Sequence, residues 1–158
     1  MIGLLFLSTK QVTSFDHQGE LSRLAMDTGF DVDFVNQVFE ELGDVSGAVI
    51  HFGTEDCFCL KVAEEHVNSI KLLATKMDYK NYNIQLDKQL KLKLPSVPAV
   101  AVINKQSSLS YLGPYSTGMF CAEGKGLVEP YLLNSSTKQN FFGAAIITDA
   151  KGCYCNLS

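Results

Sequence analysis

The chain has 158 residues, a formal net charge of −4 and an apolar share of 46%. A chain of this length buries a core without help from disulfides or metal, so its five cysteines need another explanation. Arg23 is the only arginine, and no lysine cluster of the kind that neutralises phosphates accompanies it, so nucleic acid is not an expected partner.

The chain begins with an apolar run over residues 1–7. This run is far shorter than the roughly 20 residues that cross a bilayer. It has no basic residues before it and no clear small-residue cleavage site after it. It fits the tail of a membrane anchor or signal segment of a longer precursor, and equally an ordinary strand or helix start. We therefore expect a periplasmic or membrane-anchored protein facing an oxidising compartment, with a cytoplasmic location as the alternative.

Apolar residues recur at helical spacing between residues 19 and 42, with a break at residues 28–31. This pattern predicts two helices or one kinked helix, and Gly43 is a natural C-terminal stop. We assign residues 1–44 to an N-terminal segment and helical extension. Residues 45–158 form the main domain, and the two parts make one compact unit.

A strand, a helix and a second strand follow. Residues 47–52 read as a short buried strand, and Thr54, Glu55 and Asp56 offer side chains that cap a helix. Apolar residues then repeat every three to four positions over residues 57–77, which predicts a long helix. Residues 82–86 alternate and predict a strand, and such a crossover implies parallel pairing.

The second half of the chain predicts a further pair of strands and a late helix. Residues 99–103 are continuously apolar, as in the centre of a buried sheet, and residues 109–112 return as an antiparallel strand. Residues 126–133 favour a short helix, residues 141–148 a strand, and residues 151–155 a turn into a last short strand. The expected fold is α/β, with a mixed central sheet flanked by helices, an antiparallel edge and a C-terminal hairpin.

Cys57 and Cys59 are separated by one residue where the first strand meets the long helix. The N–H groups of a helix N-terminus favour a thiolate, the attacking species in disulfide exchange, whereas the carboxylates of Glu55 and Asp56 oppose it. A Cys57–Cys59 disulfide closes a small ring, which suits a donor or isomerase better than a strong reductant. The two need not pair with each other, and a mixed arrangement with Cys121 as the resolving thiol is also open.

Cys153 and Cys155 form a second Cys-x-Cys motif near the C-terminus. They read as a second disulfide or as surface thiols. Together with the first pair they offer four metal ligands, and His51 or His66 can join them. Their spacing is too tight for a common zinc site, although copper(I) tolerates close thiolates. We assign no metal and no cofactor; His51 reads as a satisfied core histidine and His66 as part of the helix body.

The strand, the cysteine-bearing helix start and the later Val97-Pro98 together resemble the thioredoxin-like superfamily. This resemblance implies a three-layer fold and a cis peptide bond before Pro98, which lies beside the active-site cysteines. It also implies that the backbone before Pro98 pairs with a substrate peptide. More closely, the chain looks like a group of poorly characterised bacterial thioredoxin-like proteins over residues 45–155. The residues that carry this likeness are Asp56-Cys57-Phe58-Cys59, Val97–Ala101, Leu112–Gly118 and Gly152–Cys155.

The chain departs from that superfamily because it has no Cys-x-x-Cys motif and no tryptophan. Our leading hypothesis is a thiol–disulfide oxidoreductase-like protein that acts on the thiols or disulfides of other proteins. Cys57 is the expected nucleophile, as the more exposed cysteine in related folds, Cys59 or Cys121 resolves the mixed disulfide, and Pro98 shapes the substrate groove. The alternatives are a metal-binding protein with zinc or copper, and a non-catalytic interaction module of the same fold.

Overall fold

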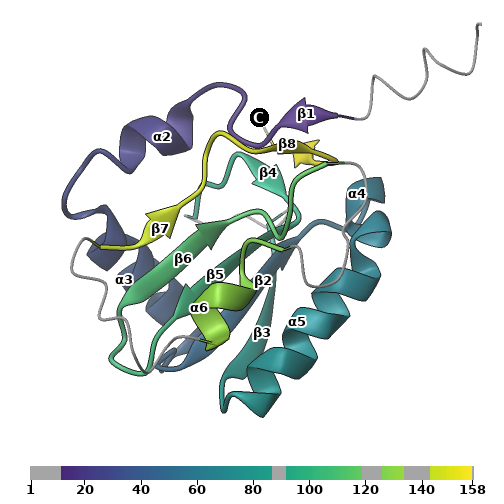
Figure 1. Ribbon diagram of the computed structural model, residues 1–158. Helices are drawn as coiled ribbons and strands as arrows, with labels where there is room; N and C mark the ends of the chain where they lie inside the picture. Colours follow the sequence, from purple (N-terminus) through teal and green to yellow (C-terminus); the bar gives the residue numbers. More distant parts are fainter. Residues whose placement is uncertain (1–11, 87–91, 119–125, 134–142, 158) are drawn as a thin grey trace, which may run out of the picture.

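The computed structural model describes residues 12–86, 92–118, 126–133 and 143–157. Figure 1 shows a central sheet with helices on both faces, α3 on one and α5 with α6 on the other. The helices are α2 (Glu20–Leu24), α3 (Phe30–Leu42), α4 (Phe58–Val62), α5 (Glu64–Lys76) and α6 (Glu129–Leu133). The strands are β1 (Thr13–Ser14), β2 (Ala48–Gly53), β3 (Lys80–Gln85), β4 (Ser96–Val97), β5 (Ala99–Ile103), β6 (Leu109–Gly113), β7 (Ala145–Ile146), β8 (Lys151–Gly152) and β9 (Cys155–Asn156).

The central sheet has the order β3-β2-β5-β6-β7 and is mixed, as the sequence predicts. The helical crossover from β2 to β3 makes these two strands parallel, and the tight turn between β5 and β6 makes that pair antiparallel. The edge differs from our expectation of an antiparallel one. β7 pairs with β6 in parallel, because the segment that contains α6 separates the two strands in the sequence.

Strand alternation divides the core into two layers. Successive side chains of β2 and β5 point to opposite faces of the sheet. On one face, Ile50 and Ala101 pack with Phe34 and Val38 of α3. On the other face, Val49, Val100 and Val102 pack with Ile70 and Ala74 of α5 and with Leu132 of α6. Burial on both faces explains why residues 99–103 are continuously apolar.

The predicted break before α3 is confirmed, since α2 and α3 are separate helices. Asp31 and Asp33 lie in the first turn of α3, where negative charge is favourable. Phe34 and Val38 are one turn apart and share the buried face. Gly43 ends the helix with a φ of 81°, a conformation that glycine adopts without steric cost.

The helix predicted over residues 57–77 is two helices in the structure. Ala63 lies between α4 and α5, as the C-cap of the first and the N-cap of the second, and its backbone angles remain near the helical region. Gly53 lets the start of this unit approach β2, because a Cβ atom at that position would lie 2.9 Å from Leu60 Cδ2. The cysteine-bearing turn is therefore packed tightly against the end of β2.

The predicted C-terminal hairpin is wrong. β7 pairs with β6, β8 with β1 and β9 with β4, so the last strands bind different parts of the chain instead of one another. The two disulfides formed by this segment explain the difference. Cys153 and Cys155 both bond to cysteines of the α4 region, and side chains two residues apart share one side only in an extended chain.

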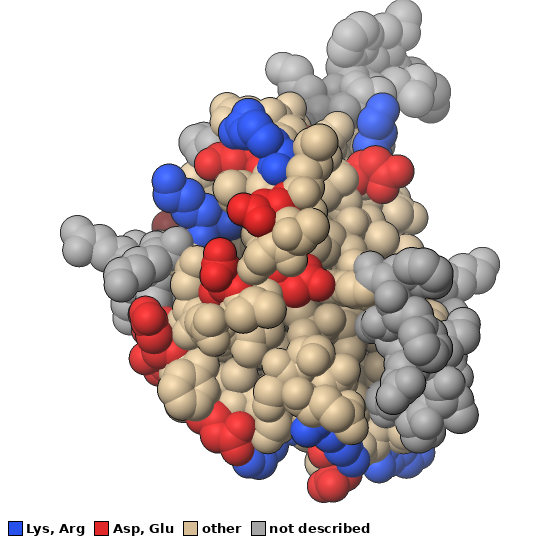
Figure 2. All heavy atoms as spheres, turned by 90° about the vertical axis from the view of Figure 1, so that its left-hand side faces the viewer, with Lys and Arg blue, Asp and Glu red and all other residues tan. Residues whose placement is uncertain are grey.

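Charged side chains of both signs are dispersed over the face that carries α2 and α3. Figure 2 shows acidic side chains across the middle of the face that carries α2 and α3, with basic side chains toward its upper and lower ends. In the described part of the chain, no helix combines the length and the hydropathy that a membrane crossing requires. The apolar residues 1–7 lie outside the described residues.

Candidate functional site

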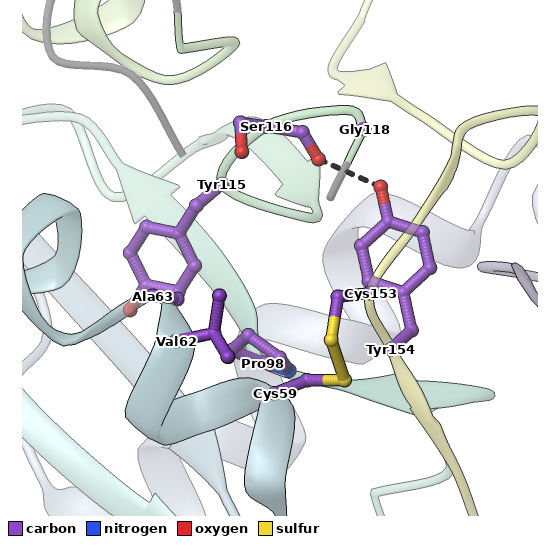
Figure 3. A pocket seen from close by; sticks show the side chains of 9 residues that line it. All are labelled: Cys59, Val62, Ala63, Pro98, Tyr115, Ser116, Gly118, Cys153 and Tyr154. Atoms are coloured by element: carbon purple, nitrogen blue, oxygen red, sulfur yellow. Dashed lines mark hydrogen bonds between the residues drawn. A yellow bond between two sulfur atoms is a disulfide. The ribbon is translucent and has the colours of Figure 1, made fainter. Parts of the chain in front are cut away.

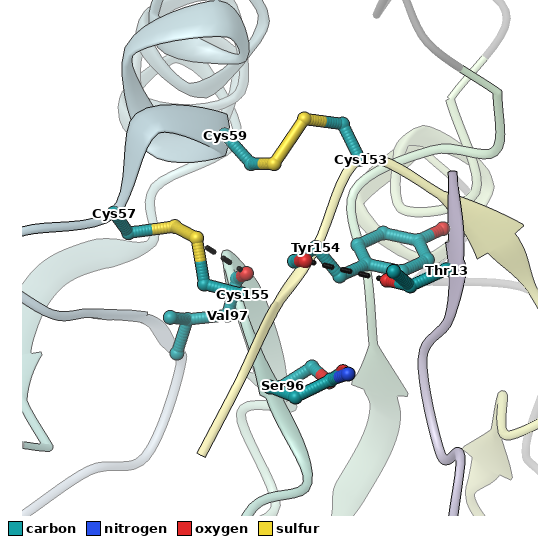
Figure 4. The surroundings of a disulfide bond; sticks show 9 residues. Thr13, Cys57, Cys59, Ser96, Val97, Cys153, Tyr154 and Cys155 are labelled. Atoms are coloured by element: carbon teal, nitrogen blue, oxygen red, sulfur yellow. Dashed lines mark hydrogen bonds between the residues drawn. A yellow bond between two sulfur atoms is a disulfide. The ribbon is translucent and has the colours of Figure 1, made fainter. Parts of the chain in front are cut away.

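Two disulfides join the two Cys-x-Cys motifs. Cys57 is bonded to Cys155 and Cys59 to Cys153, with Cα atoms 5.9 Å and 5.4 Å apart. Figure 4 shows them as neighbouring links between the start of α4 and the C-terminal segment, residues 150–157. The bond between Cys57 and Cys59 that the sequence left open is therefore not the one formed.

Local geometry explains this pairing. Cys57 is the N-cap of α4 and Cys59 is its second residue, and side chains two positions apart on a helix do not face each other. Cys153 and Cys155 are also two positions apart, but their segment is extended, so both point toward α4. Tyr154 between them points to the opposite side (Figure 4).

The Cys57–Cys155 disulfide, called the outer disulfide below, lies against strand β4. Cys155 is opposite Val97 in the antiparallel β4–β9 pair, and Cys57 Sγ lies 3.7 Å from the Val97 carbonyl oxygen. The peptide bond between Val97 and Pro98 is cis. Cys57, Cys155 and the residue before Pro98 therefore meet at one place.

Backbone and side-chain contacts hold the C-terminal segment before it reaches β4. Phe15 N–H donates to the Ala150 carbonyl at 2.9 Å, and Cys153 N–H donates to the Gly118 carbonyl at 3.2 Å. The Tyr154 hydroxyl donates to the Ser116 carbonyl at 2.6 Å, and its ring packs edge-on against Phe15 at a centroid distance of 5.3 Å. Apart from Lys151, the segment is buried up to Tyr154.

A small cavity lies beside the inner disulfide, which is the bond between Cys59 and Cys153. Its volume is about 10 Å³, which holds at most one water molecule. In Figure 3, Tyr115 lies on one side of this cavity, and Tyr154 with the Cys59–Cys153 disulfide lies on the other. Its lining residues are Cys59, Val62, Ala63, Pro98, Tyr115, Ser116, Gly118, Cys153 and Tyr154. The C-terminal segment thus fills most of the space beside Pro98.

The four cysteines differ in exposure. Cys57 is 3% exposed, and Cys59 and Cys153 are each 8% exposed. Cys155 is only partly buried. Our expectation that Cys57 is the more open residue of its motif does not hold in this disulfide-bonded form, in which Cys57 is less exposed than Cys59. Cys155 is therefore the most exposed of these four cysteine residues.

The sequence raised two alternatives, a resolving role for Cys121 and a metal site. Cys121 lies outside the described residues, so its place relative to the disulfides is not described. A metal site built on both Cys-x-Cys motifs needs thiolates, and the four cysteines are disulfide-bonded. Among the described residues, no three or more His, Cys, Asp or Glu side chains gather in a metal-binding group.

His51 and His66, the two histidines considered as metal ligands, are buried and hydrogen-bonded to other side chains. His51 forms hydrogen bonds with the Tyr115 hydroxyl and with Asn81 Oδ1, which confirms the interpretation of a satisfied core histidine. Burial lowers the pKa of His51 to about 4, so its ring is neutral near pH 7. His66 lies on α5, and its Nε2 atom is 2.7 Å from Glu129 Oε1 on α6.

The sequence identified the cysteines but not their pairing. It also did not identify Tyr154, whose hydroxyl and ring hold the C-terminal segment against Ser116 and Phe15. One feature of the sequence pointed to this pairing. The two Cys-x-Cys motifs have the same spacing, and the second, Cys153–Cys155, was expected in a turn that leads into a strand. Matched spacing permits two neighbouring cross-links. It does not identify the partners, because four cysteines allow three connectivities.

Comparison with protein families gives one match. The model of a family described as "Domain of unknown function (DUF6436)" matches residues 16–157. No curated protein and no solved structure matches the chain significantly. The matched range includes both Cys-x-Cys motifs and every strand of the central sheet.

Proposed function

We propose that this chain, which belongs to the DUF6436 family, is a thiol–disulfide oxidoreductase-like protein that acts on protein thiols. One observation carries the proposal. The Cys57–Cys155 disulfide includes a partly exposed residue and lies where β2 meets α4, against Val97, the residue before Pro98. This is the position that the resemblance to the thioredoxin-like superfamily assigns to reactive cysteines. Membership of that superfamily is part of the proposal.

The exchange proceeds in two balanced steps. A substrate thiolate attacks Cys155 Sγ, forms a mixed disulfide with it, and releases Cys57 as a thiolate that takes up a proton. The second thiol of the substrate, as its thiolate, then attacks the first substrate sulfur and releases Cys155. The substrate gains a disulfide, and the protein gains two thiols. Two electrons pass from the substrate to the protein.

The other candidate residues take supporting roles in this proposal. Cys59 and Cys153 keep the C-terminal segment attached while Cys155 reacts. Pro98 lines the small cavity beside the Cys59–Cys153 disulfide, and Val97 before it contacts Cys57, so in this proposal Pro98 shapes the groove next to the reacting pair. Cys121 is a further thiol that can resolve a mixed disulfide, and a Cys121→Ser variant tests this role directly. Stable intramolecular disulfides are characteristic of oxidising compartments, which supports a periplasmic location or one on a membrane surface that faces such a compartment.

The experiment compares two double variants. The oxidised protein is mixed with a reduced dithiol peptide, and disulfide formation in the peptide is followed by mass. The Cys57→Ser, Cys155→Ser variant is expected to lose the reaction, whereas the Cys59→Ser, Cys153→Ser variant keeps it. Equal rates in both variants, or no oxidation above that by air, contradict the proposal.

A second candidate function is a non-catalytic interaction module whose disulfides only cross-link the fold. The observation in its favour is burial, since Cys57, Cys59 and Cys153 are each at most 8% exposed. In that case both double variants lose stability, and the wild-type protein oxidises no peptide. The same two variants therefore distinguish the two functions.

A further inference from the structure

Helix α3 carries apolar side chains on two sides. Phe34 and Val38 face the core and are at most 5% exposed, whereas Val32 and Phe39 are 63% and 57% exposed. Val32 lies two positions before Phe34, which is about 160° around a helix. Phe39 lies seven positions after Val32, nearly back on the same side. The core of the chain therefore does not account for these two side chains.

Two partly buried residues continue this exposed apolar side toward the core. Val35 and Leu42 pack against the core cluster, and they follow Val32 and Phe39 by three positions each. Alternating steps of three and four residues are the spacing by which one helix packs along another. We call these residues the outer stripe of α3: Val32, Val35, Phe39 and Leu42.

The charge beside the outer stripe has one sign. Asp33 follows Val32 and Glu40 follows Phe39, so each carboxylate lies about 100° around the helix from an exposed apolar side chain. No lysine or arginine occurs between residues 24 and 60. Figure 2 shows acidic side chains across the middle of the face that carries α2 and α3. A negative potential therefore accompanies the apolar stripe.

Helix α5 provides a comparison within the same chain. It has the same length as α3 and covers the opposite face of the sheet (Figure 1). It exposes Leu72, which is 72% accessible, but it combines Glu64 and Glu65 with Lys71 and Lys76. Its exposed apolar residue thus lacks the acidic surroundings of the outer stripe.

The combination of apolar and acidic side chains selects the kind of occupant. A second copy of α3 on the stripe would bring acidic side chains against acidic side chains, and such like-charge contacts are costly. An anionic lipid surface would be repelled for the same reason. A helix with apolar residues along one side and basic residues beside them satisfies both the shape and the charge of this surface.

We propose that the outer stripe is the docking surface for a basic amphipathic helix of another protein. The apolar residues of that helix cover Val32 and Phe39, and its lysines or arginines lie near Asp33 and Glu40. Phe39 is the central anchor, because a large aromatic side chain buries much area at little cost in rotamer freedom. The inference does not rest on disulfide exchange, since α3 lies apart from α4 and its cysteines (Figure 1).

The test measures binding of a fluorescent peptide to the full chain by anisotropy. The peptide has about 20 residues of leucine, alanine and lysine, a length that supports a helix on its own. Its leucines follow the three-and-four spacing, with lysines beside them. One control peptide has the same composition with the leucines spread around the helix, and another has glutamate in place of lysine. Binding is measured at low and at raised salt.

The variants separate the outer stripe from other exposed surface. Phe39→Ala is expected to weaken binding about tenfold or more, whereas Leu72→Ala on α5 leaves it unchanged. The double variant Asp33→Asn, Glu40→Gln should weaken binding several-fold at low salt and reduce its salt dependence. Glu64→Gln, Glu65→Gln on α5 is the matched control for charge and should have little effect. Urea unfolding checks that each variant is folded.

Several outcomes overturn the inference. They are no saturable binding of the basic peptide, equal binding of either control peptide, and equal losses for the α3 and α5 variants. Sedimentation that shows a dimer of the wild-type chain, converted to monomer by Phe39→Ala, assigns the stripe to a second copy instead. Binding that occurs only after deletion of residues 1–11 assigns it to the chain's own N-terminal residues. A failure of peptide oxidation by Cys57–Cys155 overturns the proposed function and leaves this inference intact.

Discussion

Cys155 lies directly opposite Val97 in the β4–β9 pair, while its sulfur is bonded to Cys57. The same residue therefore belongs to a backbone ladder and to a covalent link between the C-terminus and the start of α4. The ladder places the Cys155 sulfur next to the strand-to-helix turn that carries Cys57. With that disulfide broken, the described contacts of residues 155–157 are the short β4–β9 pair, the Leu157–Pro95 backbone bond and the Ser96–Asn156 side-chain contact.

The two disulfides should contribute to stability in a strongly non-additive way. They have sequence separations of 98 and 94 residues and connect nearly the same points. Either one alone closes the long loop, and the second then closes a ring of only about six residues. In the chain-entropy model, loss of one pair costs about 2 kcal/mol, whereas loss of both costs about 7 kcal/mol.

The measurement is urea unfolding of the wild-type protein, the two double Cys→Ser variants and the quadruple variant, all without reductant. Each double variant controls for the other, because both remove the same number of sulfur atoms. Costs that simply add from the double variants to the quadruple variant contradict this account of the cross-links.

Tyr154 should stabilise the protein through its buried hydroxyl. Tyr154→Phe removes a hydrogen bond of 2.6 Å to the Ser116 carbonyl and keeps the ring against Phe15. We expect a loss of about 1–2 kcal/mol in the free energy of unfolding. Tyr82→Phe is the matched control, since its hydroxyl makes an exposed bond of 3.5 Å, and it should cost less than about 0.5 kcal/mol. Similar losses for both variants would speak against Tyr154 as an anchor.

His51 should make stability depend on pH below neutrality. Burial lowers its pKa from 6.5 to about 4, so the unfolded chain takes up a proton at a pH where the folded chain does not. The free energy of unfolding should therefore fall between pH 6.5 and 4, by about 1.4 kcal/mol per pH unit and about 3 kcal/mol in total. Above pH 6.5 this contribution is constant.

Urea unfolding at a series of pH values measures this effect, with His51→Gln as the comparison. The variant is less stable at pH 7 but has lost the titrating group, so its stability should fall less steeply between pH 6.5 and 4. Parallel pH profiles for the two proteins would show that another group is responsible.

Much of the fold is predictable from the sequence, because strand alternation and helical spacing act locally. The continuous apolar run at residues 99–103 identified the buried strand β5, and the spacing around Phe34 and Val38 identified α3. The break at Ala63 was missed because apolar spacing continues across it. The last short strand was expected, but the pairing of residues 151–156 was not, because these strands are two residues long and their partners, β1 and β4, are distant in the sequence.

The candidate site was predicted in part for the same reason. Cys57 and Cys59 stand out locally, at the junction of a strand and a helix. Their bonds to Cys155 and Cys153 depend on how residues nearly a hundred positions apart meet in space, which no local pattern encodes. The contacts of Tyr154 with Ser116 and Phe15 depend in the same way on where the C-terminal segment lies in the fold.

The central claim is that Cys57–Cys155 is the exchangeable disulfide, and graded reduction of the native protein tests it most directly. The oxidised protein is titrated with a dithiol, free thiols are alkylated, and the labelled cysteines are located by peptide mass. We predict label on Cys57 and Cys155 first, with Cys59–Cys153 intact until the reductant is raised further. Label on Cys59 and Cys153 first, or on all four cysteines only when the protein unfolds, would contradict the account.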